Sequence, residues 1–145
     1  MDNNVNVLDE INKGATMGMD AIMFVYDKVG DQTFKQVLDG EYRKYKDISE
    51  RVTAEYDNYS IKAPHSTNAM DKAMTWYGIQ MKTMKDQSNE KISELLMKGT
   101  NMGIIEGVRL QNQNQNNDLN ENVRQILNDF VAMQEDSVET LKKYL

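Results

Sequence analysis

Apolar residues recur at alternating spacings of three and four along four stretches of the chain, with polar residues between them. This spacing predicts amphipathic α-helices, each with one buried stripe, over residues 5–29, 32–56, 90–111 and 120–144. The buried stripe of the first helix is predicted to contain Leu8, Ile11, Ala15, Gly18, Ile22, Val25 and Val29. Gly30 and Asp31 fit a helix end and an N-cap, so a short turn should join the first two helices as an antiparallel hairpin.

A short motif, Lys-Gly-x-x-Met-Gly, occurs at residues 13–18 and again 85 residues later, at residues 98–103. Each copy lies in a long helical stretch that is followed by a second one, which indicates a duplicated helical hairpin. We therefore predict a single domain over residues 1–145, with hairpin one at 5–57 and hairpin two at 90–145. Glycines follow four-residue spacing in both copies, and each costs a helix interior up to about 1 kcal/mol. Close approach of two helix backbones is the simplest packing reason for them.

The two hairpins are separated by a segment of different character. It contains the only proline, Pro64, and the only histidine, His65. A short crossover helix is predicted over residues 66–85, with a Met-rich face of Met70, Ala73, Met74, Tyr77, Met81 and Met84. Residues 111–117, all Asn or Gln, predict an exposed loop inside hairpin two.

Charge and composition exclude several classes of partner. The formal net charge of −6 argues against nucleic acid and anionic membrane surfaces, which call for clustered Lys and Arg. No stretch approaches the roughly 20 apolar residues of a membrane span, and the N-terminus has no basic segment followed by an apolar one, so we expect a cytoplasmic protein. The chain has no cysteine and no phosphate-binding or nucleophile motif.

Polar residues interrupt the buried stripe of the second and fourth long helices at the same level. Aligned 93 residues apart, Glu41 matches Gln134 and Lys44 matches Ser137. A purely structural bundle would usually place Leu or Ile at such positions. One interpretation is a site, or the remains of one, with a buried Lys44 ammonium paired to Glu41. The other is that the register is shifted by one residue and Glu41–Lys44 is a surface pair worth at most about 0.5 kcal/mol.

Two helical hairpins with inward polar residues, joined by a long connection that contains a short helix, resemble the ferritin-like bundles. More narrowly, the chain is similar to a rubrerythrin-related bacterial family of unknown function. The resemblance implies an all-α, ferritin-like up-down four-helix bundle with a short extra crossover helix. It also implies an inward Glu on the first helix of each hairpin and Glu-x-x-His on the second, which together hold two iron ions.

Carried onto this chain, the implied ligand positions are degenerate. They fall at Ala15, Glu41, Lys44, Thr100, Gln134 and Ser137. Only Glu41 keeps a ligand side chain, whereas iron and manganese need several carboxylate or imidazole donors. We therefore expect no metal and no cofactor.

The resulting expectation is a non-catalytic bundle without a di-iron site, structural or protein-interacting, with a role in stress or sporulation implied by the resemblance alone. A homodimer or another protein partner is expected. One alternative is a metal-binding protein with remodelled ligands around Glu41, Glu94, Glu106 or Glu135. Another is a bundle that binds an apolar small molecule in a glycine-lined, Met-rich cavity.

Overall fold

The computed structural model describes residues 3–59, 78, 80, 84–116 and 119–145. Its elements are α1 (Asn3–Tyr26), α2 (Gln32–Tyr56), a 3₁₀ turn η1 (Asp57–Tyr59), α4 (Asn89–Gln113) and α5 (Glu121–Lys142). No strand occurs in this described part, and the predicted all-α class is confirmed. Most of the predicted crossover helix lies outside the described residues. Within it Gly78 and Gln80 are helical, whereas Met84 and Lys85 are not, so the predicted end at residue 85 is too late.

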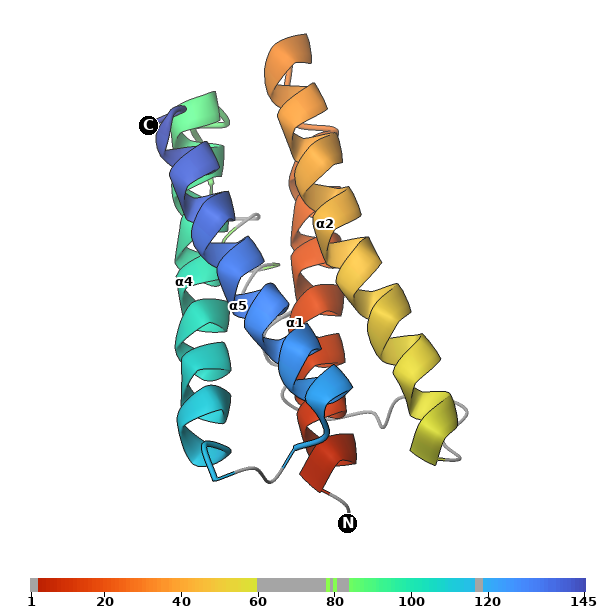
Figure 1. Ribbon diagram of the computed structural model, residues 1–145. Helices are drawn as coiled ribbons and strands as arrows, with labels where there is room; N and C mark the ends of the chain where they lie inside the picture. The colour runs from red at the N-terminus through yellow and green to blue at the C-terminus, as the bar shows by residue number, and fades with distance from the viewer. Residues whose placement is uncertain (1–2, 60–77, 79, 81–83, 117–118) are drawn as a thin grey trace.

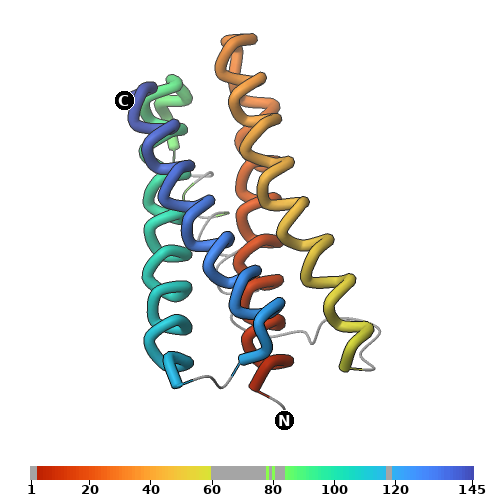
Figure 2. Tube along the Cα trace, viewed as in Figure 1, coloured from red at the N-terminus to blue at the C-terminus, as the bar shows by residue number. Residues whose placement is uncertain are grey.

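The four long helices pack as two antiparallel hairpins, α1 with α2 and α4 with α5 (Figure 1), as predicted. The up-down order holds within each hairpin only. Because α2 ends at one end of the bundle and α4 begins at the other, α4 runs in the same direction as α2 (Figure 2).

Capping side chains set several helix boundaries. The Asp31 carboxylate accepts hydrogen bonds from the backbone N–H groups of Thr33 and Phe34, at 2.8 and 3.2 Å, and starts α2 as predicted. The predicted end of the first helix is wrong: α1 stops at Tyr26, and Gly30 follows it by four residues without a positive φ.

The Asn/Gln tract is only partly the exposed loop that its composition predicts. α4 continues into the tract as far as Gln113, and the next residue, Asn114, is buried. The side-chain amide of Asn114 donates to the Leu110 backbone carbonyl at 2.8 Å, and the Asn114 backbone carbonyl accepts from the Arg124 guanidinium at 2.9 Å. These bonds satisfy the end of α4 and explain why the helix outlasts its apolar pattern.

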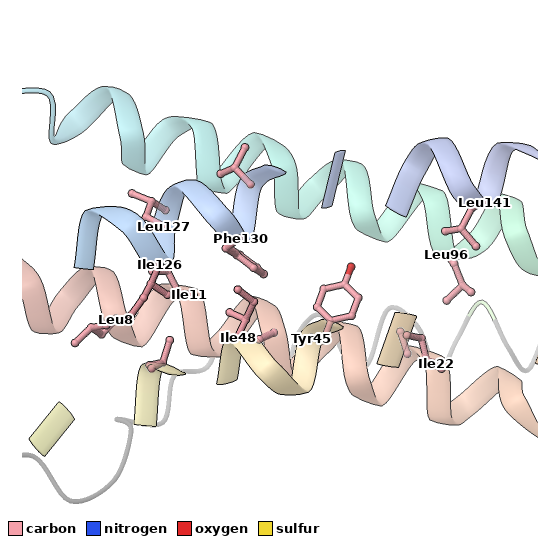
Figure 3. Close-up of a cluster of buried hydrophobic side chains, with 14 of the residues drawn as sticks. Leu8, Ile11, Ile22, Tyr45, Ile48, Leu96, Ile126, Leu127, Phe130 and Leu141 are labelled. Carbon is pink, nitrogen blue, oxygen red and sulfur yellow. The ribbon is translucent and has the colours of Figure 1, made fainter. Parts of the chain in front are cut away.

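The core is a continuous stripe of apolar side chains from all four helices (Figure 3). On α2 the sequence pattern predicts a buried stripe of Phe34, Val37, Glu41, Lys44, Ile48 and Val52. The observed stripe differs at two turns, because Leu38 and Tyr45 are buried while Val37 and Lys44 are only half-buried. Both sets of positions alternate spacings of three and four, so the pattern alone does not choose between them. The displacement brings a tyrosine into the middle of the bundle.

The glycine stripes serve a different purpose from the predicted close approach of backbones. A Cβ atom on Gly18 would lie 2.5 Å from the Tyr45 ring, and one on Gly14 would lie 2.7 Å from the Phe130 ring. On α4, a Cβ on Gly103 would meet the Gln134 amide. The glycines of α1 and α4 therefore make room for large side chains from α2 and α5.

Candidate functional site

Four of the six implied ligand positions line one cavity at the middle of the bundle. Glu41, Thr100, Gln134 and Ser137 surround a volume of about 50 Å³. Of the other two, Ala15 is fully buried in the apolar core and Lys44 lies at the edge of the polar layer. The repeat in the sequence thus correctly placed these four residues at one level.

Among the described residues that line the cavity, Glu41 is the only carboxylate, and it is 4% exposed. One of its oxygens accepts a hydrogen bond from the Ser137 hydroxyl at 2.5 Å. The other lies 3.0 Å from the Lys44 ammonium, one helical turn along α2. A buried carboxylate is stable only when it is paired and hydrogen-bonded, and these two contacts meet that requirement.

Lys44 is neither fully buried nor part of a surface pair, so both interpretations of the sequence need correction. Its side chain is 35% exposed and reaches a second partner, Asp136 on α5, at 2.8 Å. Burial lowers the pKa of Lys44, but the hydrogen bonds and charges of Asp136 and Glu41 outweigh it and leave that pKa raised. The same contact lowers the pKa of Asp136. Lys44 is therefore a charged bridge between a buried and an exposed carboxylate.

Tyr45 is the residue of the site that the sequence pattern missed. Its side chain points from α2 across the bundle (Figure 3), and its ring packs against Gly18. Burial raises the pKa of the Tyr45 hydroxyl, and this effect outweighs the neighbouring side chains of Thr100 and Gln134, which lower that pKa. The α2 sequence also allows a second buried stripe that passes through Leu38, and this alternative stripe would have placed Tyr45 in the core.

Gln134 leaves one polar atom without a partner. The side chain is 2% exposed, its amide lies against Gly103, and its Oε1 accepts no hydrogen bond in the structure. Thr100, its neighbour across the cavity, donates to the Leu96 carbonyl at 2.8 Å. An unpaired buried acceptor costs free energy, so Gln134 Oε1 is the atom here that needs an explanation.

The donors around the cavity do not fit a di-iron centre. Across the described residues, no group of three or more Asp, Glu, His or Cys side chains gathers where it could hold a metal ion. Glu94 pairs with Lys91 and Lys98, Glu106 pairs with Arg109, and Glu135 is exposed. None of these three lines the cavity, and His65 lies outside the described residues.

An open groove between α1 and α4 adjoins the cavity. Its volume is about 380 Å³, and it shares Gly14, Met17 and Gly103 with the cavity lining. The other groove residues are mostly apolar and include Met102, Ile105, Leu110 and Phe130. Ile105 is 55% exposed, which is high for a large apolar side chain.

Comparison of the chain with protein-family models, with curated proteins and with solved structures finds no match. Within the described ranges, no helix combines the length and the apolar character that crossing a membrane requires. Function therefore has to be inferred from the geometry of the cavity, its polar layer and the groove.

Proposed function

We propose that this chain is a non-catalytic, ferritin-like bundle that works without a di-iron centre and serves a structural or protein-interacting role. Its support is the pair of hairpins, the parallel direction of α2 and α4, and the polar layer at mid-height. The rubrerythrin-related affiliation, the cytoplasmic location and the bacterial stress or sporulation context belong to the same proposal. They rest on the resemblance of the sequence pattern.

The observation that carries the proposal is the occupancy of the polar layer by the chain's own side chains. The Tyr45 ring fills the space beside Gly18, and the single carboxylate, Glu41, is already bound by Ser137 and Lys44. A divalent ion at this level would have to displace the Lys44 ammonium and would still find one carboxylate. Such a donor set is too poor for iron or manganese.

Elemental analysis tests this proposal directly. Protein produced with added iron, manganese and zinc, then dialysed, should contain well below one metal ion per chain. Stoichiometric metal that is lost in Glu41→Ala but kept in the exposed control Glu135→Ala would overturn the proposal. It would favour the remodelled-ligand alternative instead.

For the protein-interacting role, we propose a second copy of the chain as the partner. Met23 is 62% exposed, and the adjacent Phe24 is exposed as well, near the turn of hairpin one. Asp27 and Lys28 follow them, so a second copy would meet charges of both signs there rather than a uniformly acidic surface. Sedimentation equilibrium should show a dimer that Met23→Glu weakens. A strictly monomeric chain at high micromolar concentration would contradict this part.

A second candidate function is the binding of an apolar small molecule. The specific observation in its favour is that the cavity and the groove adjoin and share three lining residues, the cavity being more polar and the groove mostly apolar. Sites for small molecules typically combine mostly apolar walls with a few convergent polar groups. This combination is present beside Gly103.

A further inference from the structure

The junction of cavity and groove lies between two glycines on facing helices. Gly14 on α1 and Gly103 on α4 belong to both linings, together with the flexible side chain of Met17. The inner volume of about 50 Å³ exceeds the roughly 10–15 Å³ that one water molecule requires. A small head group therefore fits inside, while anything longer has to extend into the groove.

The inner end of this space presents hydrogen-bond acceptors. Gln134 Oε1 is buried and has no partner among the described residues, and the amide that carries it packs against Gly103 with its Nε2 nearer than its Oε1. Glu41 adds a carboxylate to the same lining. A ligand head group that donates a hydrogen bond would satisfy the orphan acceptor, whereas an anionic head group would meet a carboxylate.

The outer part is suited to a hydrocarbon chain. Met17, Met102, Ile105 and Leu110 supply unbranched or aliphatic walls, and Phe130 closes the inner side. Methionine adapts its shape to varied apolar surfaces, so these walls do not demand a single chain geometry. Two charged pairs, Glu10–Lys13 and Glu106–Arg109, neutralise the groove's charged side chains.

We propose that the cavity and groove bind a single-chain amphipathic molecule, a primary alcohol or amine, with its donor head at Gln134 and its alkyl tail along Met102 and Ile105. The proposal rests on the second candidate function and specifies its ligand class. It also specifies selectivity, because a carboxylate head on the same tail is disfavoured by the negative charge of Glu41 in the cavity lining.

Isothermal titration with 1-octanol and with octanoate at neutral pH tests the proposal, since the two probes differ only in the head group. Octanol should bind, and octanoate should bind at least about tenfold more weakly. A tenfold difference in Kd corresponds to roughly 1.4 kcal/mol of binding free energy. Ile105→Glu places a charge on the tail path and should weaken octanol binding by about tenfold or more. Leu145→Glu, an apolar-to-acidic change at a similarly exposed position outside the cavity and the groove, should leave octanol binding unchanged.

Gln134→Leu supplies an independent check on the head group. Leucine is close in size to glutamine, and the substitution removes an unpaired buried acceptor. The bundle should therefore stay folded, which circular dichroism can verify. The preference for octanol over octanoate should shrink by about tenfold, because the hydrogen bond is lost.

Several outcomes would overturn the ligand proposal: no octanol binding, equal binding of both probes, or binding that Ile105→Glu leaves intact. Self-association lost in Ile105→Glu, without octanol binding, would assign the groove to a protein partner and reject the ligand. Stoichiometric metal would overturn the metal-free proposal and leave the octanol result standing.

Discussion

Replacing Lys44 with methionine tests whether the polar layer is held by charge pairing. The substitution keeps the aliphatic stem and removes the ammonium that lies 3.0 Å from Glu41. Glu41, buried from solvent, would keep only the Ser137 hydroxyl as a partner. The loss in the free energy of unfolding should therefore come from the buried Glu41 carboxylate that is left without its ammonium partner, not from the removal of the lysine itself.

The magnitude follows from the exposure of the three charged groups. Removing one partner of a fully buried pair costs about 3–5 kcal/mol, but Lys44 is one-third exposed and partly screened, so about 2–3 kcal/mol is expected. Asp136 is 67% exposed, and Asp136→Ala should cost less than about 1 kcal/mol. The double variant Glu41→Leu/Lys44→Met should lie within about 1 kcal/mol of the parent or exceed it, because no unpaired charge remains.

Urea unfolding followed by circular dichroism measures the stability of all three variants. The slope of the free energy of unfolding against urea concentration should be the same in each, which shows that they unfold to a common state. Equal losses in Lys44→Met and Asp136→Ala would refute the reasoning, since they would mean that Glu41 does not depend on Lys44. A double variant less stable than Lys44→Met would do the same.

Two further predictions concern the tyrosines and the glycines. Burial and the hydrogen bond to Asp9, at 2.5 Å, raise the pKa of Tyr56 above its ordinary 10.0. The neutral phenol is thus favoured in the fold, and its contribution is present below pH 10 and lost as the pH rises towards the folded-state pKa. The free energy of unfolding should fall above about pH 10, and less steeply in Tyr56→Phe; identical pH profiles would contradict this. Gly18→Ala should cost about 1–3 kcal/mol, because its Cβ would meet the enclosed Tyr45 ring. Gly40→Ala, with no atom near the new Cβ on an exposed helix face, should stabilise by about 0.5–1 kcal/mol. Chemical denaturation compares the two glycine variants, and equal effects would refute the packing explanation.

The fold was predictable as far as local pattern determines it. The α1 stripe from Leu8 to Val25 is buried as its spacing predicts, apart from the half-buried Gly18, and Asp31 caps the helix that follows. On α2, one stripe passes through Val37 and the other through Leu38. Which of the two stripes is buried depends on the side chains of the helices packed against α2. The sequence of α2 alone does not contain that information.

The position of the polar layer along the bundle was predictable from the sequence, but not all of the residues that form it were. The repeat places Glu41 and Gln134 at one height, because equivalent positions of two similar hairpins face the same core. The partner of Lys44 was not predictable: Asp136 lies 92 residues away on an exposed face of α5, where the apolar pattern carries no information. Tyr45 was missed for a related reason, since half-polar aromatic residues suit both core and surface.

The polar contacts between α2 and α5 also determine how the two hairpins are aligned lengthwise. Glu41 meets Ser137, Lys44 meets Asp136, and Arg51 meets Asp129 at 2.9 Å. Apolar stripes with a regular repeat would pack almost as well after a slide of one helical turn, about 5.4 Å. The same slide would separate every one of these pairs and strand the Glu41 carboxylate. During folding, two preformed hairpins therefore dock stably in one register, so the polar residues between α2 and α5 select the correct assembly.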